Sequence, residues 1–420
     1  MSNKFFATEY SLADFYLPDT DNPLEVSDDW KDWRNETRWA TSLYEQALLK
    51  GPRPVTRLDT WDKGDVVNMS SYNYLGMVND ERVIDAAKAA LNKYGAGACG
   101  SSILSGMTDL HRELEHRMAA FLGREDCMLF SSGFGGALGI LAGLLRKDDV
   151  ALLDEKSHIS LMDGVRLSGA RLELFSHNDA ASLRTLLEKH AGKRRVVVAE
   201  GVYSMDGDLG NLPELCAVAR EHGVGVVVDE AHSILTFGEK GRGAVEQLNC
   251  EQDVILQYGT FSKAFAAVGG FVSGPKDLLG YLRFFANSYS FSCALPPSVV
   301  ASILAVLDIF ERDKSCRDKL RENTEYFRCE LNAMGVNTGE SVSQVVPVIV
   351  GSDRKFLYEA GIAMREKGLF LVPVDYPSVP EDGLRFRASV TAAHSRADLH
   401  KAIQIIKEVI VPHVSGQQNG

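Results

Sequence analysis

The chain has 420 residues, enough for two or three domains. Hydrophobic residues make up 45% of it and charged residues 24%, which is typical of globular proteins and excludes disordered and fibrous classes. The formal net charge of −12 argues against binding to nucleic acid or to an anionic membrane, because both need a basic protein surface.

The seven cysteines include no C-x-x-C pair, and their number is odd. A disulfide framework or a structural zinc site is therefore not expected, and we predict a reduced, cytoplasmic protein without a metal. The N-terminus is polar and acidic and has no apolar signal core. One uncharged stretch, 127–145, is long enough to span a membrane, but its serines and five glycines favour a buried strand, a glycine turn and a packed helix. We therefore predict no transmembrane segment.

Residues 1–60 differ in pattern from the rest and are interpreted as an N-terminal arm rather than a domain with its own core. Apolar residues at helical spacing predict an amphipathic helix over about 29–50, which Gly-Pro-Arg-Pro at 51–54 would end. The pattern consists of Trp30, Trp33, Trp39, Leu43 and Ala47.

From about residue 66 short apolar runs alternate with helical stretches. Fully apolar strands separated by helices predict a mostly parallel, seven-stranded sheet covered on both faces, within a large α/β domain over 61–295. A smaller α+β domain is predicted over 296–420, with helices at 315–334, 353–367 and 395–410 and strands VVPVIV and LRFRASV. The strands of the large domain are CMLF (127–130), VALLD (150–154), LELF (172–175), VVVAE (196–200), VGVVVDE (224–230), VILQYGTF (254–261) and VGGFVSG (268–274).

Two charged residues lie at or just after the carboxyl ends of predicted strands of the large domain. Asp229 ends the run GVGVVVD, at the carboxyl end of a strand, where open α/β sheets place their ligands. A buried carboxylate there is costly unless it meets a cation, although a structural cap is an equal alternative. Lys263 follows another strand within GTFSK, and a lysine enclosed between buried strands can act as a Schiff-base nucleophile.

A glycine-rich segment and a histidine complete the pattern. The segment SSGFGG (131–136) lies between a strand and an apolar helix, where exposed amides and hydroxyls form an anion site. It matches neither a nucleotide P-loop nor a dinucleotide turn, so a single phosphate suits it better. His158 follows the strand VALLD and could lie flat on a ring. A lysine, a carboxylate, an imidazole and a phosphate site together are what pyridoxal 5′-phosphate requires.

At the level of motifs, the sequence over roughly 65–410 resembles the α-oxoamine synthases, which are fold-type-I pyridoxal-phosphate enzymes, and among them most resembles bacterial serine palmitoyltransferases. This resemblance implies a fold-type-I transferase fold. The motifs that carry it are SYNYLGM (71–77), YGAGACGS (94–101), HRELE (111–115), FSSGF (130–134), EGVYSMDGD (200–208), VDEAHS (228–233), GEKGRGA (238–244), GTFSKA (259–264), FSCALPPS (291–298) and RASVTAAH (387–394).

The resemblance also implies a role for individual residues. Lys263 matches the Schiff-base lysine, Asp229 the partner of the pyridine nitrogen, His158 the stacking histidine and His232 a residue near the phenolic oxygen of the cofactor; these four form the predicted catalytic set. Further cofactor ligands and the substrate-binding set are then implied. The cofactor ligands are Gly133, Phe134, Ser204, Thr260, Ser262 and, from the other subunit of a homodimer, Ser292; the substrate-binding residues are Tyr72, Asn73 and Arg387.

The implied reaction is a decarboxylative Claisen condensation of a small L-amino acid with an acyl thioester, on CoA or on an acyl carrier protein, giving an α-amino ketone. L-Serine and a long-chain acyl-CoA are the first interpretation, which would place the enzyme in sphingolipid biosynthesis. Glycine or alanine as substrate remains an alternative, and so does a pyridoxal-phosphate aminotransferase. Ser102, Met107 and Phe134 depart from the serine palmitoyltransferase pattern and leave both substrate pockets open.

Overall fold

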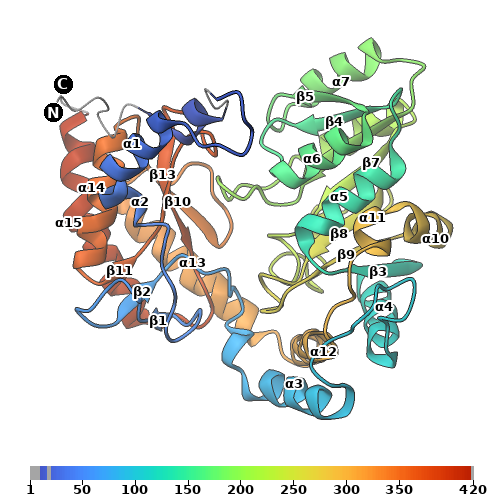
Figure 1. The fold of residues 1–420 in the computed structure, drawn as a ribbon, viewed down its shortest axis with the longest axis horizontal. Helices are drawn as coiled ribbons and strands as arrows, with labels where there is room; N and C mark the ends of the chain where they lie inside the picture. Colours follow the sequence, from blue (N-terminus) through green and yellow to red (C-terminus); the bar gives the residue numbers. More distant parts are fainter. Residues whose placement is uncertain (1–9, 17–19, 418–420) are drawn as a thin grey trace. The chain divides into compact units, whose positions relative to one another are not determined.

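The computed structural model of the protein describes residues 10–16 and 20–417 (Figure 1). They form two compact units. The larger unit comprises Tyr72–Ser204 and Asp208–Lys319, and the smaller unit combines the described residues up to Ser71 with Met205–Gly207 and the described residues from Leu320 on. Within the described ranges, the helices all lack the length of apolar sequence that crossing a membrane requires.

The larger unit is built on a seven-stranded sheet, as predicted. The strand order is β3-β9-β8-β7-β6-β4-β5, and only β9 runs antiparallel to its neighbours. The carboxyl ends of the other six strands therefore lie at one end of the sheet. The strands are β3 (Asp126–Phe130), β4 (Val150–Asp154), β5 (Arg171–Phe175), β6 (Arg195–Glu200), β7 (Gly225–Asp229), β8 (Val254–Thr260) and β9 (Gly270–Gly274).

Helices cover both faces of this sheet, because nearly every side chain of the central strands is apolar and buried. One core cluster joins the sheet to α5, α6 and α10, and a second joins the opposite face to α7 and α8. The helices of the larger unit are α3 (Glu81–Tyr94), α4 (Asp109–Leu122), α5 (Gly133–Leu144), α6 (Ile159–Ser168), α7 (Ala180–Lys189), α8 (Leu212–Glu221), α9 (Ala244–Gln247), α10 (Lys276–Phe285), α11 (Asn287–Ser290) and α12 (Pro297–Arg312).

The long uncharged stretch at 127–145 forms β3, a short turn and α5, which confirms the interpretation as strand, glycine turn and helix. Helix α5 packs on the sheet through small residues. A Cβ atom at Gly136 would lie 3.0 Å from the ring of Tyr258, and one at Gly139 would lie 2.8 Å from the ring of Phe130. The glycines therefore let the amino end of α5 approach the strand ends closely.

The smaller unit contains two three-stranded sheets. The order β10-β13-β12 is antiparallel throughout, and in the order β1-β2-β11 the strand β11 is parallel to β2. The predicted helices and strands of the C-terminal segment are all present. The elements are the 3₁₀ helix η1 (Leu12–Phe15), α1 (Asp28–Glu36), α2 (Arg38–Thr41), β1 (Val55–Thr56), β2 (Val66–Asn68), α13 (Ser315–Ala333), β10 (Val345–Gly351), α14 (Arg354–Glu366), β11 (Leu369–Phe370), β12 (Pro373–Val374), β13 (Leu384–Ser389) and α15 (Arg396–Gln417).

The single helix predicted over about 29–50 is wrong beyond its first turns. The segment forms α1 and the short α2, followed by turns and irregular structure with one β-bridge at Leu48. A hydroxyl group explains where the helical bonding ends: Ser42 Oγ donates to the Trp39 carbonyl oxygen at 3.0 Å, and the Leu43 amide donates to Ala40 instead. Such side chains compete with the backbone for the carbonyl groups that a continuing helix would use.

Candidate active site

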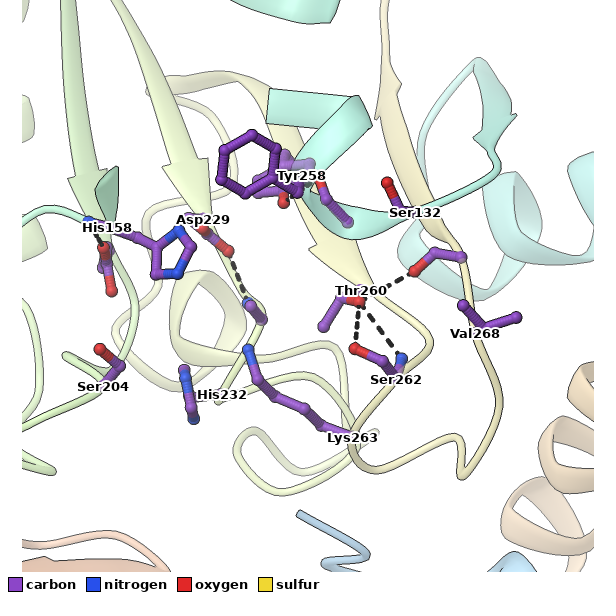
Figure 2. Close-up of a pocket in the computed structure, with 15 residues that line it drawn as sticks. Ser132, His158, Ser204, Asp229, His232, Tyr258, Thr260, Ser262, Lys263 and Val268 are labelled. Carbon is purple, nitrogen blue, oxygen red and sulfur yellow. Dashed lines mark hydrogen bonds between the residues drawn. The ribbon is translucent and has the colours of Figure 1, made fainter. Parts of the chain in front are cut away.

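A cavity of about 280 Å³ opens at the carboxyl ends of the central strands of the larger unit (Figure 2). Nine of the residues assigned to the cofactor from sequence line this one cavity, although they come from five separate stretches of the chain. They are Gly133, Phe134, His158, Ser204, Asp229, His232, Thr260, Ser262 and Lys263.

Asp229 is the last residue of β7 and is buried. Its Oδ1 accepts a hydrogen bond from the amide of Ala231 at 2.7 Å, whereas Oδ2 has no hydrogen-bond donor among the described residues. Burial raises the pKa of Asp229 to about 6, although the positive charge of Lys263 acts in the opposite direction. The carboxylate is thus a buried anion whose cost a cation in the cavity would offset.

Lys263 lies in the loop between β8 and β9, three residues after β8 ends. Its carbonyl accepts the Ala266 amide at 2.9 Å, and the Phe261 carbonyl accepts the Ala267 amide at 3.0 Å, so the loop is tightly turned. Figure 2 shows its side chain extending into the cavity, with Asp229 and His158 on one side and Thr260 and Ser262 on the other.

The amino end of α5 forms the wall of the cavity beside Thr260 and Ser262. Ser132 caps the helix by accepting the Gly135 amide at 2.9 Å, which leaves the amides of Gly133 and Phe134 without an acceptor in the part of the chain that the structure describes. A Cβ at Gly133 would lie 2.7 Å from Thr260 Oγ1, so only glycine permits this approach. Two amides, the hydroxyls and the helix dipole favour a phosphate here.

His158 is the N-cap of α6 and lines the cavity. Its Nδ1 lies 2.7 Å from Ser160 Oγ, and its backbone amide donates to Glu200 Oε1 at 2.5 Å. Glu200 ends β6, directly beside Asp229 in the parallel ladder. Burial, and then the charge of Asp229, raises the pKa of Glu200 well above its usual range. Glu200 therefore fixes the backbone position of His158 through this hydrogen bond.

His232 is held by an aromatic side chain. Its Nδ1 lies 2.8 Å from the hydroxyl of the buried Tyr74, and its ring centroid is 6.5 Å from that of Tyr72. Tyr72 is thus near the cavity without lining it. Ser204, four residues after the end of β6, lines the cavity wall near His232 (Figure 2).

Three other predicted site residues are not among the lining residues. Ser292 Oγ lies 3.0 Å from Ser131 Oγ, and Asn73 Oδ1 accepts the Val78 amide at 3.3 Å. Arg387 belongs to β13 of the smaller unit, where its Nη1 lies 3.9 Å from Met205 Sδ. The roles assigned to these residues and to the cavity residues stay predictions.

Sequence reasoning missed several residues of the site. Glu200 and Tyr258 line the cavity, and Tyr258 donates its hydroxyl to the Gly133 carbonyl at 2.5 Å. Glu200 ends an apolar strand as Asp229 does, so the same strand-end signal could have identified it. Tyr74 carried no such signal, because its contact with His232 joins positions 158 residues apart.

Comparisons with known proteins identify one family and two kinds of similar enzyme. Residues 64–406 match the family described as aminotransferase class I and II. An 8-amino-7-oxononanoate synthase of Thermoanaerobacter pseudethanolicus is 37% identical and covers 86% of this chain and 90% of its own. A serine palmitoyltransferase of Bacteriovorax stolpii is also 37% identical, covering 81% and 82%.

Solved structures agree with these sequence matches. A serine palmitoyltransferase structure with pyridoxal phosphate has a TM-score of 0.87 at 31% identity, covering 92% of this chain and 98% of the other. An 8-amino-7-oxononanoate synthase of Francisella tularensis has a TM-score of 0.70 at 25% identity, covering 82% and 97%. The chain thus has the fold-type-I transferase fold that the sequence predicted.

The cofactor is pyridoxal 5′-phosphate, and the cavity fits it. The buried Asp229 oxygen without a donor suits the protonated pyridine nitrogen, and the amides of Gly133 and Phe134 suit the phosphate. Lys263 suits the aldehyde carbon, since its amine can bond covalently to it. When bound, the cofactor supplies an electron sink for a carbanion at the substrate Cα.

Proposed function

The chain belongs to the α-oxoamine synthases of the class I and II aminotransferase family, and on that premise we propose that it condenses a small L-amino acid with an acyl thioester. Carbon dioxide and the free thiol leave, and an α-amino ketone is formed. The observation that carries this proposal is the single cavity in which Lys263, Asp229 and the amino end of α5 come together.

Each residue of the cavity has a distinct task in this proposal. The amine of Lys263 holds the cofactor and moves the proton from the substrate Cα. Asp229 keeps a proton on the pyridine nitrogen, because a buried carboxylate is stabilised by a neighbouring cation. His158 supports the ring, and its backbone is held in place by Glu200. His232, positioned by Tyr74, would contact the phenolic oxygen of the bound cofactor.

L-Serine and a long-chain acyl-CoA are the proposed substrates, with 3-ketosphinganine as the product. The motif pattern and the TM-score of 0.87 to serine palmitoyltransferase support this choice. A second candidate uses alanine or glycine with another acyl thioester, and the equal identity to an 8-amino-7-oxononanoate synthase favours it. Arg387, with Tyr72 and Asn73, is proposed to bind the amino acid.

The proposed active unit is a cytoplasmic homodimer in which Ser292 reaches the phosphate site of the partner. Its neighbourhood supports this, because Phe291 is 86% exposed and Leu104 is 83% exposed. Aromatic side chains such as Phe291 are enriched at protein–protein interfaces. Full activity in a species shown to be monomeric would exclude the shared site.

A substrate panel tests the proposal. Serine, alanine and glycine are each combined with short, medium and long acyl-CoAs, and release of free thiol is followed together with the ketone product. The proposal expects the greatest kcat/KM with serine and a long-chain donor. Thiol release with alanine or glycine instead would select the second candidate, and transamination without thiol release would show an aminotransferase.

A further inference from the structure

A second polar cavity lies in the larger unit, at the opposite end of its strands from the candidate active site. It has a volume of about 540 Å³ and is formed where β8 begins and β9 ends. The active-site cavity lies where β8 ends. Because β8 has seven residues, the two cavities are roughly 20 Å apart along the sheet.

Arg124 lines this second cavity and is held in one orientation. Its Nη1 donates to the carbonyl oxygens of Glu251 and Val254 at 3.1 and 2.9 Å. Its Nη2 is buried and has no acceptor, and among the described residues no carboxylate forms an ion pair with it. Burial lowers the pKa of Arg124, although the charges of Glu251 and Glu230 act in the opposite direction.

Arg242 reaches the same cavity from the loop before α9. Its backbone is fixed, since its amide donates to Glu246 Oε2 at 2.9 Å and its carbonyl accepts Gln257 Nε2 at 2.8 Å. Its guanidinium makes no hydrogen bond or ion pair with any described residue, and its Nε is buried. Gly123, with a φ of +68°, allows this placement because a Cβ there would lie 3.1 Å from Arg242 Nη1.

Two carboxylates also line the cavity, but among the described residues neither forms an ion pair with Arg124 or Arg242. Glu125 Oε2 already accepts the Lys276 amide at 2.9 Å, and the side chain of Glu251 forms no ion pair among the described residues. The cavity therefore offers two guanidinium groups with unused N–H donors, alongside carboxylate acceptors. A guanidinium binds an oxyanion through two parallel hydrogen bonds, whereas carboxylates accept from hydroxyl groups.

We propose that this cavity binds a small phosphate ester that carries hydroxyl groups. The phosphate accepts hydrogen bonds from Arg242 and Arg124, and the hydroxyls donate to Glu125 and Glu251. The volume is larger than that of the cofactor cavity, so the site admits a molecule rather than an inorganic ion alone. The site is separate from the proposed catalytic centre and does not depend on the reaction assigned to it.

Isothermal titration of the holoenzyme with glycerol 3-phosphate, at ionic strength fixed with chloride, tests the proposal. The bound cofactor occupies the phosphate site at α5, and no amino acid or thioester is present. Saturable binding is expected, and Arg242→Gln should weaken it by about tenfold or more, since hydrogen bonds to a charged group are lost. The affinity of Arg242→Lys should lie between that of the unmodified protein and that of Arg242→Gln, because lysine keeps the charge without the planar fork.

The matched control is Arg184→Gln, which changes a partly exposed arginine of the same unit that pairs with Glu221 at 2.6 Å. It should bind as the unmodified protein does. The visible spectrum of the bound cofactor verifies that each variant is folded and loaded. Absence of saturable binding, or equal affinity in both Arg242 variants and the unmodified protein, would overturn the proposal.

Discussion

Two strands of the same sheet end in a buried aspartate, and the two aspartates have opposite surroundings. Asp154 ends β4, where its oxygens accept from His177 Nδ1 at 3.0 Å and from the amides of Lys156 and Asn178 at 2.9 and 2.8 Å. Asp229 ends β7 with one amide donor and an oxygen directed to the cavity. Burial acts against both charges, yet the pKa of Asp154 is lowered and that of Asp229 is raised.

The difference lies in where the compensating cation comes from. At β4 the protein contains it, because His177 lies between Asp154 and Asp208, 2.8 Å from the latter. At β7 the ligand must supply it. The same strand-end carboxylate thus builds a permanent structural cluster in one place and a ligand site in the other, which is the physical reason why burial of a charge alone does not identify a catalytic residue.

The largest effect is expected from Lys263→Ala. Turnover should fall by at least about four orders of magnitude, because the covalent bond to the cofactor and the proton acceptor are both removed. The visible absorption of the lysine-bound cofactor should disappear while the far-UV circular dichroism is unchanged. Lys156→Ala, which changes the exposed lysine after Asp154, is the control and should retain activity. Substantial activity in Lys263→Ala would refute the assignment.

Asp229→Asn tests the contrast between the two strand ends. An amide does not keep the pyridine nitrogen protonated, so kcat should fall by about two to three orders of magnitude, with much less effect on the KM for the amino acid. Steady-state kinetics of the folded, cofactor-loaded variants measure this. In contrast, Asp154→Asn should lower the free energy of unfolding and leave kcat of the folded enzyme near that of the unmodified protein. If both variants behaved alike, the distinction between the two strand ends would fail.

Much of this contrast was predictable for β7 and little of it for β4. The strand runs and the small residues around Lys263 are local patterns, so the sheet and the residues that meet at its carboxyl end follow from the sequence. The cluster at β4 joins Asp154, His177 and Asp208 across loops, and no local spacing signals it. For the same reason Tyr74 was missed, and the helix over 29–50 was overextended because the hydroxyl contact of Ser42 outweighed its apolar spacing.

The β4 cluster predicts a stability that depends on pH. Burial alone would lower the pKa of His177, but hydrogen bonds to Asp154 and Asp208 raise it to about 9. A group whose pKa is raised by folding contributes its full stabilisation at pH values below its pKa in the unfolded chain, which is about 6.5 for histidine. It loses this contribution as the pH rises through its folded pKa of about 9. Relative to His177→Asn, the free energy of unfolding should therefore fall by about 2 kcal/mol between pH 6.5 and 10. Denaturant unfolding at several pH values measures the difference; a constant difference would contradict the charged pair.

The smallest effect concerns the inverse arrangement, in which the ligand brings the carboxylate and the protein the cation. Arg387 is proposed to bind the carboxylate of the amino acid, and its planar fork would fix the Cα bond that breaks. Arg387→Lys keeps the charge without the fork, so the KM for the amino acid should rise about tenfold and that for the acyl thioester should change little.

The matched control is Arg385→Lys, two residues earlier in β13, where Nη1 donates to Asp206 at 2.8 Å and the side chain is buried. That exchange should reduce stability and leave the amino-acid KM unaltered. An unchanged KM in Arg387→Lys would exclude Arg387 as the carboxylate ligand, whereas a matching rise in both KM values would show that it acts on the fold of the smaller unit rather than on one substrate.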